Sequence, residues 1–372
     1  MKYNLDDRTE NGQRKRIMLW GAGEKTREFL SYHEFYDDII EIAAIADADE
    51  KKWGKSLEGY QIIPPKEAYG MDYERFIVPS EQYFEEIAER ILSDTGMEKS
   101  GIEHVTYITK CKLAVRYAKH ADKADLLSYI RNHPLGAFNY PFVEKYTGVC
   151  PEIGYDGEAG LFFVIHKGRR MYMARWFRTE EMVLAYYRNL LMEQDEHSPH
   201  RYLQGEFEVK QGDVVVDAGA AEGIFTLEVI ERAKKVYVIE TNREWVEALS
   251  YTFRDYREKI EIINRFVSDY TAYRTAALDD LIQDDVDFLK MDVEGCEYAA
   301  MAGAEKLIKS TSHIRCALCA YHSDHDGLAL KVLAERFGLR TSFSEGYMLF
   351  PYSIQQTYIM PTFRRGLLRC EK

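Results

Sequence analysis

Cysteine is scarce in this sequence, long apolar runs are absent, and basic residues do not outnumber acidic ones. The 372 residues contain only 6 cysteines, a pattern too sparse for a disulfide framework. No uninterrupted apolar stretch approaches the roughly 20 residues that span a bilayer, and the charged N-terminus lacks the apolar core of a secretory signal. We therefore expect a cytoplasmic protein without a membrane span.

The charge balance argues against a nucleic-acid partner. The chain has 49 Lys and Arg against 62 Asp and Glu, a formal net charge of −13, and an acidic surface repels a phosphate backbone. Two short basic clusters, residues 14–16 and 167–170, are typical of a solvated terminus and a solvated turn.

Two of the cysteines, Cys316 and Cys319, have the spacing of a metal-binding pair. They lie in the apolar run 314–320, which we interpret as a buried strand, where positions three apart face opposite sides. No second pair completes a zinc site, so we expect structural thiols.

The length predicts two or three domains, and the pattern of apolar segments divides the chain into three regions. Residues 1–102 alternate strand and helix and predict a small Rossmann-like α/β domain. Residues 103–178 predict a connecting region with a helix over 110–132, a loop over 139–160 and a β-hairpin over 161–174. Residues 179–372 begin with a helix and then alternate strands with helices. The strands expected there are 213–216, 235–239, 260–264, 286–291 and 314–320, followed by a closing hairpin of 340–344 with 347–350.

A glycine turn follows the first of these strands, in the segment Asp217-Ala-Gly219-Ala-Ala221-Glu222-Gly223. Glycines there permit a tight turn and a close approach at the helix start, and ligands of such sheets bind at the carboxyl ends of the strands. A dinucleotide would bring a pyrophosphate to this turn, which Asp217 would repel. S-adenosylmethionine carries a sulfonium and an ammonium instead, so the pattern favours a methyl donor over NAD.

The next two strands predict the rest of a donor site. Glu240 ends the second strand, where a carboxylate can accept the ribose hydroxyls, and Asn242 follows it. Val267 and Ser268 follow the third strand, where the adenine would lie.

Acidic residues crowd the end of the fourth strand, in Lys290-Met-Asp292-Val-Glu294-Gly-Cys-Glu297. Crowding of like charges raises at least one carboxyl pKa, which suits a general base or a metal site. The alternative is that Glu294 and Glu297 only decorate a helix N-terminus, where acids are favoured.

At these positions the sequence resembles the FkbM-type family of S-adenosylmethionine-dependent methyltransferases. The resemblance rests on residues 216–223, 277–282 and 287–297, and extends to 193–202 and 320–322. It implies a Rossmann-like methyltransferase domain with a mostly parallel seven-stranded sheet, S-adenosylmethionine as donor, and O-methylation of a sugar or glycan-like acceptor in polysaccharide or natural-product biosynthesis.

A hydroxyl acceptor needs help to lose its proton. His322, at the end of the fifth strand, is our candidate base, because the ordinary pKa of histidine suits neutral pH. Asp292 and Glu294 are the alternative base, or ligands of a divalent cation that prefers oxygen. Lys290 belongs to the same group of catalytic candidates, and Tyr202, with His200, is expected to cover the donor.

The N-terminal region has Gly21-Ala-Gly23 after a strand and Asp47 further on, but Thr26 occupies the third glycine position of a dinucleotide fingerprint. We expect this region to do one of two things. It could bind a nucleotide, which would suit a nucleotide-linked acceptor, or it could serve as a scaffold or dimerisation module, in which case the protein could be a homo-oligomer. Two alternatives to the methyltransferase therefore remain: an NAD-dependent sugar-nucleotide oxidoreductase or epimerase, and a non-catalytic nucleotide-binding scaffold.

Overall fold

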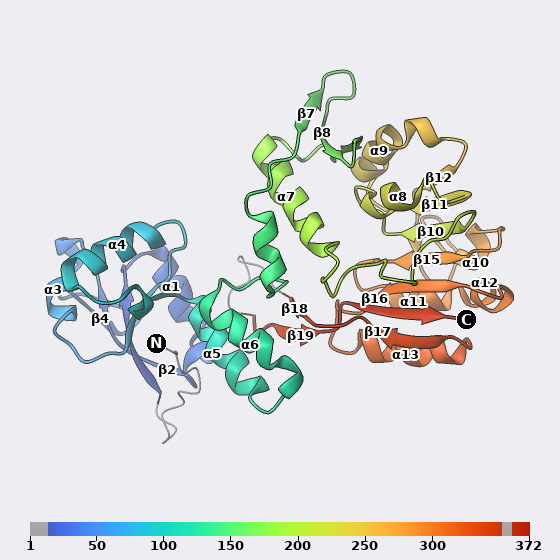
Figure 1. The fold of residues 1–372 in the computed structure, drawn as a ribbon. Coiled ribbons are helices and arrows are strands. Elements are labelled where there is room, and N and C mark those ends of the chain that lie inside the picture. Colours follow the sequence, from blue (N-terminus) through green and yellow to red (C-terminus); the bar gives the residue numbers. More distant parts are fainter. Residues whose placement is uncertain (1–13, 352–358) are drawn as a thin grey trace. The chain divides into compact units, whose positions relative to one another are not determined.

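The computed structural model describes residues 14–351 and 359–372. The chain divides into two compact units, which we describe separately (Figure 1). Of the described residues, the N-terminal unit takes in 14–139, 351 and 359–362, and the C-terminal unit takes in Tyr140–Phe350 and Phe363–Lys372.

The N-terminal unit is built on a sheet whose order, within the described residues, is β3-β4-β2-β1-β5-β6. Its strands are β1 (Lys15–Trp20), β2 (Ile40–Ala46), β3 (Ser56–Leu57), β4 (Tyr60–Ile63), β5 (Arg75–Val78) and β6 (Ile102–His104). Its helices are α1 (Glu24–Ser31), α2 (His33–Tyr36), α3 (Pro65–Ala68), α4 (Phe84–Thr95), α5 (Thr106–Tyr117) and α6 (Ala124–Asn132). All strand pairs are parallel except β3 with β4, which confirms the α/β prediction for this region.

The sheet of this unit has an apolar layer on each face. Ile17 and Leu19 of β1 pack into one buried cluster, while Met18 and Trp20 pack into another. Such alternation is what a strand covered on both sides requires.

The region predicted as a connection is shared between the units. The single helix expected over 110–132 is two helices, α5 and α6, which end the N-terminal unit. The loop expected over 139–160 contains a strand, β7 (Ile153–Asp156), which pairs with the predicted hairpin of β8 (Leu161–His166) and β9 (Arg169–Tyr172). Backbone pairing along β8 thus gives this glycine-containing segment an extended conformation, which its composition did not suggest.

The C-terminal unit contains, in its described residues, a 7-stranded sheet of order β12-β11-β10-β15-β16-β20-β17. Its strands are β10 (Val214–Ala218), β11 (Lys235–Ile239), β12 (Ile260–Ile263), β15 (Phe288–Met291), β16 (Arg315–Cys319), β17 (Arg340–Phe343) and β20 (Leu367–Glu371). The first five are parallel, and β20 runs antiparallel to both of its neighbours. The mostly parallel seven-stranded sheet expected of a Rossmann-like methyltransferase is therefore present.

Helices cover both faces of this sheet (Figure 1). One face packs on α7 (Glu180–Glu193), α8 (Ile224–Val229) and α9 (Arg243–Thr252). The other packs on α10 (Leu278–Leu281), α11 (Glu297–Ala302), α12 (Glu305–Ser310) and α13 (Asp326–Arg336). Within β10, Val215 faces the first set, and Val214 and Val216 face the second.

The end of the chain differs from the prediction in one respect. We expected 340–344 and 347–350 to form a hairpin, but β17 pairs with β20. The second segment, β18 (Met348–Phe350), joins β19 (Thr362–Arg364) in a separate two-stranded sheet, as β13 (Phe266–Val267) joins β14 (Thr275–Ala276). Pairing with the apolar last strand adds β17 to the edge of the main sheet, where its residues stay exposed or half-buried.

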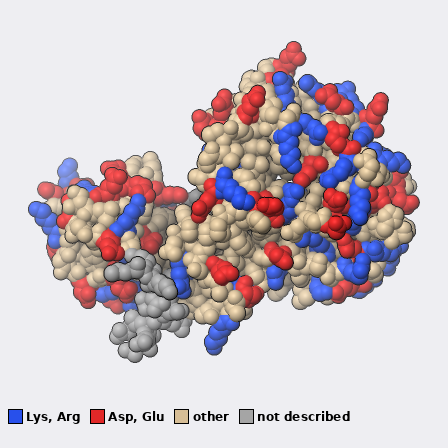
Figure 2. Space-filling view, viewed as in Figure 1, with Lys and Arg blue, Asp and Glu red and all other residues tan. Residues whose placement is uncertain are grey.

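Cys316 and Cys319 lie in β16 and pack into the opposite faces of the sheet, as predicted for structural thiols. Within the described segments, no helix has both the length and the apolar character that crossing a membrane requires. Acidic and basic side chains are interspersed over the visible face of the C-terminal unit (Figure 2).

Candidate active site

A cavity of about 620 Å³ opens at the carboxyl ends of β10, β11 and β15 in the C-terminal unit. This is the edge at which ligands of open α/β sheets bind, and the volume is typical of a small-molecule site. Most of the predicted donor and catalytic residues line it: Tyr202, Gly219, Ala221, Glu222, Glu240, Asn242, Val267, Lys290, Asp292 and Glu294. The fold therefore gathers residues that lie far apart in the sequence.

The glycine turn after β10 is required by close packing. Gly219 has a φ of +76°, and a Cβ there would lie 1.7 Å from the carbonyl oxygen of Asp292. Gly223 has a φ of +85°, and its Cβ would lie 2.8 Å from Leu249 and from the ring of Phe253. Glycine is the residue that tolerates both conditions. The turn thus brings the backbone of β10 against the end of β15, where Asp292 lies.

Asp217 lies beneath the cavity and not in its wall. Its side chain is fully buried and forms an ion pair of 3.0 Å with Lys290, while Thr226 Oγ1 donates to it at 2.7 Å. Lys290 Nζ also donates to the carbonyl oxygen of Gly219 at 2.5 Å. Burial works against the charge of Lys290, but Asp217 and Asp292 hold its pKa well above its usual range. The Asp217–Lys290 pair therefore ties β10 to β15, and the negative charge expected to face the donor is neutralised.

Glu240 is held at the tip of β11 by main-chain amides. Its carboxylate accepts hydrogen bonds from the amide nitrogens of Ala221 at 2.9 Å and Asn242 at 2.7 Å, and Thr241 Oγ1 approaches it at 3.4 Å. Asn242 caps α9 by accepting from the amide of Glu244. The acid is thus oriented before any ligand arrives.

The two residues expected beside the adenine are placed differently. Val267 lines the cavity together with Phe266, whose side chain is 49% exposed. Ser268 is not in the lining; its amide donates to Ala276, and its hydroxyl contacts Asp269 at 3.2 Å.

Asp292 is the centre of a network of polar side chains. Tyr202 donates to it at 2.8 Å and Tyr321 approaches at 3.5 Å, while His200 and His322 each place Nε2 3.7 Å from a carboxylate oxygen. Burial disfavours the charged form, but Lys290, the two histidines and Tyr202 outweigh it and lower the pKa of Asp292. The carboxylate in the cavity wall is therefore ionised at neutral pH.

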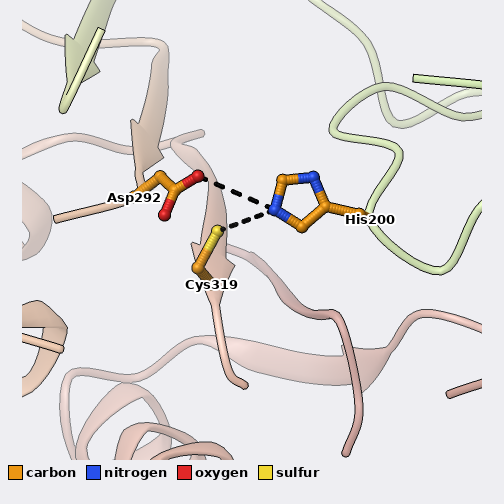
Figure 3. Close-up of side chains that lie close together, drawn as sticks. All are labelled: His200, Asp292 and Cys319. Atoms are coloured by element: carbon orange, nitrogen blue, oxygen red, sulfur yellow. Dashed lines mark hydrogen bonds and ion pairs between the residues drawn. The ribbon is translucent and has the colours of Figure 1, made fainter. Parts of the chain in front are cut away.

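The two histidines beside Asp292 have opposite protonation states. Burial lowers the pKa of His200 to about 4, although Asp292 favours the charged form. In Figure 3 its ring points at both Asp292 and Cys319, and the Cys319 sulfur lies 3.6 Å from Nε2. Burial also works against a charge on His322, but Glu294, Glu297 and Asp292 raise its pKa to about 10. His200 is therefore neutral and His322 positively charged at neutral pH.

This charge state changes the role expected for His322. A general base must be unprotonated, but His322 already carries its proton, with Nδ1 3.0 Å from Glu297. It also lies outside the cavity lining. It lies beside the carboxylates of Asp292, Glu294 and Glu297.

The expected cation ligands, Asp292 and Glu294, do not form a metal site. The clusters of metal-ligating atoms among the described residues are His200 with Asp292 and Cys319, and Asp292 with Glu297 and His322. Neither includes Glu294, whose side chain is 92% exposed. A thiol does not suit a cation that prefers oxygen. The pair predicted from the sequence, Asp292 with Glu294, is therefore not brought together as ligands.

Glu193 and Tyr186 line the cavity from α7, and we did not single them out from the sequence. Tyr186 donates to Glu222 at 2.7 Å. Burial, reinforced by the charges of Glu222 and Asp292, raises the pKa of Glu193 to about 8, and burial also raises that of Glu222. Glu193 could not be predicted as a site residue from the helix pattern alone, because an acid at the end of an amphipathic helix is common. Only the family resemblance of residues 193–202 indicated this segment.

Three segments of the chain match known families. Residues 251–340 match the methyltransferase FkbM domain, residues 203–285 match ribosomal RNA adenine dimethylase, and residues 13–103 match the C2185-like N-terminal family. No curated protein shows significant sequence similarity to the chain.

Several solved structures are similar to the chain. Methyltransferase FkbM from Methylobacillus flagellatus is 16% identical, with a TM-score of 0.43 over 97% of this chain and 91% of that chain. Trm5b from Pyrococcus abyssi is 13% identical, with a TM-score of 0.34 over 57% of this chain and 55% of that chain. An rRNA methylase from Streptococcus thermophilus is 19% identical, with a TM-score of 0.29 over 44% of this chain and 89% of that chain. Structural similarity at this level does not identify the acceptor of this chain.

The FkbM match runs from the end of α9 to the start of β17, so it contains Asp292, Glu294 and His322. The glycine turn, the acid at the tip of β11 and the strand order are those expected of a methyl-donor site. The C-terminal unit thus has a Rossmann-like methyltransferase fold, and its residues 251–340 match the methyltransferase FkbM domain.

Proposed function

We propose that the C-terminal unit transfers a methyl group from S-adenosylmethionine to a hydroxyl oxygen of a sugar or glycan-like acceptor. The observation that carries the proposal is the ionised carboxylate of Asp292 in the cavity wall, held by Tyr202 and Tyr321. Such a group can orient a hydroxyl and take its proton.

The cavity suits the donor in shape and charge. Glu240 Oε2 accepts one main-chain hydrogen bond and keeps a lone pair for a ribose hydroxyl. Phe266 and Val267 offer an apolar surface for the adenine. The ionised carboxylate of Asp292 lines the same space, and an ammonium or sulfonium is favoured beside a carboxylate. When bound, S-adenosylmethionine supplies an electrophilic methyl group on sulfur.

Elimination among the acids of the cavity leaves Asp292 as the main proton acceptor. Glu193 and Glu222 have raised pKa values, and Glu240 is occupied by main-chain amides. Glu294 is ionisable but 92% exposed at the rim. As the carbon–oxygen bond forms and the sulfur–carbon bond breaks, the hydroxyl proton becomes strongly acidic. A carboxylate of low pKa can therefore accept it, and His322 stabilises the charge of Asp292 throughout.

The charge of the site favours an uncharged polyhydroxyl acceptor over RNA. The dimethylase match over 203–285 makes an RNA base the second candidate. However, the chain has a net charge of −13, and Asp292 and Glu294 line the cavity that the acceptor would enter. A phosphate backbone would be repelled there, whereas the ring faces of a sugar can pack on aromatic walls such as Trp245 and Tyr321.

The test follows transfer of a labelled methyl group from S-adenosylmethionine to simple glycosides, nucleotide-linked sugars and an RNA oligomer. We expect an O-methyl product on a sugar hydroxyl, identified by NMR, and turnover that is unchanged by EDTA. Asp292→Asn should lose at least about 100-fold in kcat while its Kd for S-adenosylhomocysteine changes by less than tenfold. Asp285→Asn, an exposed acid before β15, is the matched control. Methylation of RNA alone, or full activity of Asp292→Asn, would contradict the proposal.

A further inference from the structure

A second cavity, of about 660 Å³, lies wholly within the N-terminal unit. It is bounded by β5, β6, α4 and α5 and by the residues at the end of α6. Its cations are Lys15, Arg75, Lys99, Lys110 and Arg131, and its acids are Glu81, Glu85 and Glu103. A cavity with a surplus of cations stands out in a chain whose net charge is −13.

Three of the cations have partners within the protein. Lys15 Nζ donates to Tyr107 at 3.1 Å. Arg75 donates to the carbonyl oxygen of Ser100 at 3.1 Å and lies 3.6 Å from Glu103. Lys99 forms an ion pair with Glu85 at 3.0 Å. These charges are accounted for by the fold.

Lys110 and Arg131 are different. Within residues 14–351 and 359–372, neither has a hydrogen-bond or ion-pair partner, although Lys110 is only 8% exposed. The Nε of Arg131 is buried without a hydrogen-bond partner. Burial lowers the pKa of Lys110 despite the nearby Glu103, and burial raises the pKa of Glu103 despite Lys110 and Arg75. An unpaired buried cation destabilises a fold, so its presence in a cavity wall calls for a partner from outside the protein.

The glycine turn expected to bind a nucleotide in this unit is already filled. Asp47 accepts from the amide of Ala22 at 2.6 Å and from that of Asp49 at 2.7 Å, and it pairs with Lys52 at 3.0 Å. These contacts place an anionic side chain where a phosphate would approach the turn between Gly21 and Gly23. None of Gly21, Gly23 and Asp47 lines the second cavity.

We propose that this cavity binds a small organic phosphate, with Lys110 and Arg131 contacting the phosphate and Phe84, Ile102 and Leu135 packing against the organic part. A guanidinium with an ammonium suits a phosphate better than a carboxylate, because it offers several N–H donors to several oxygens. The inference is independent of the chemistry of the C-terminal unit, since no residue of that unit takes part.

The experiment is calorimetric titration of the full chain with uridine diphosphate, inorganic pyrophosphate and uridine. We expect uridine diphosphate to bind and uridine not to bind, with pyrophosphate weaker because it lacks the organic part. Lys110→Met and Arg131→Gln should each weaken uridine diphosphate binding at least about tenfold. Arg116→Gln, on the exposed side of α5, removes a like charge and should have no effect.

Two further readouts keep the test decisive. Removal of an unpaired buried charge should raise the Tm of ligand-free Lys110→Met, whereas loss of a structural lysine would lower it. All variants should bind S-adenosylhomocysteine in the C-terminal unit as the parent chain does, which shows that they are folded. Equal uridine diphosphate binding by the parent and both variants, or no binding of either phosphate at millimolar concentration, would overturn the proposal.

Discussion

Replacement of Gly219 by alanine tests the packing that brings the donor turn against Asp292. Two unfavourable contributions to the free energy of folding add in this variant. A non-glycine residue in the left-handed region costs roughly 1–2 kcal/mol, and overpacking costs about 1–3 kcal/mol more because the new Cβ would lie 1.7 Å from the carbonyl oxygen of Asp292. Gly212→Ala is the matched control, since Gly212 has a φ of +90° but no atom within 4 Å of its Cβ.

The difference between the two variants isolates the close approach. We expect Gly219→Ala to be less stable than Gly212→Ala by about 1–3 kcal/mol, which is roughly 2–12 °C in Tm for a domain of this size. Because relief of the clash must move Asp292, the Kd for S-adenosylhomocysteine and kcat should also worsen in Gly219→Ala alone. Urea denaturation, calorimetry and turnover measure these effects. Equal stability and equal donor binding of the two variants would refute the reasoning.

The remaining predictions concern single acids and one histidine. Glu240→Ala should weaken S-adenosylhomocysteine binding at least about tenfold because its ribose acceptor is lost, and an unchanged Kd in calorimetry would exclude that role. The pKa of Glu193 is raised to about 8 in the folded protein, so the folded state holds more protons than the unfolded state and the free energy of unfolding falls as pH rises from about 4.5 to 8. Urea denaturation should show that Glu193→Gln loses less stability over this range than the parent chain, by more than about 1 kcal/mol. Parallel pH profiles of the two proteins would contradict this prediction. The pKa of His322 is raised to about 10, so its contribution is fully present below about pH 6.5 and is lost as pH rises through 10; His322→Gln should therefore be more destabilising at pH 6 than at pH 10.5, and a pH-independent difference would show that His322 is uncharged.

Several parts of the site follow from local sequence. The segment from Asp217 to Gly223 identifies a turn, because a tight turn and a close approach both need glycine at fixed spacing. Glu240 was predicted at the end of the second strand, and the structure places it there in the cavity wall. The alternation of apolar segments predicted the parallel sheet, because each covered strand must be apolar on both faces.

Other parts could not be predicted, because they depend on partners distant in the chain. The ion pair of Asp217 with Lys290 forms because β10 and β15 are neighbours in the sheet, so Asp217 is neutralised and cannot act as a free charge on the donor. The pairing of β17 with β20, and not with the nearer β18, likewise depends on which edge of the sheet is open.

The sequence by itself determined the fold class, the position of the glycine turn and the acids at the ends of the strands, because spacing and composition act over short distances along the chain. Only the tertiary structure decided the charge of those residues. His322 is protonated because the fold places it beside Glu294, Glu297 and Asp292, which outweigh its burial. His200, buried near Asp292, is neutral because burial outweighs that one carboxylate. A pKa depends on desolvation and on neighbouring charges in space, and neither is present in the order of the amino acids.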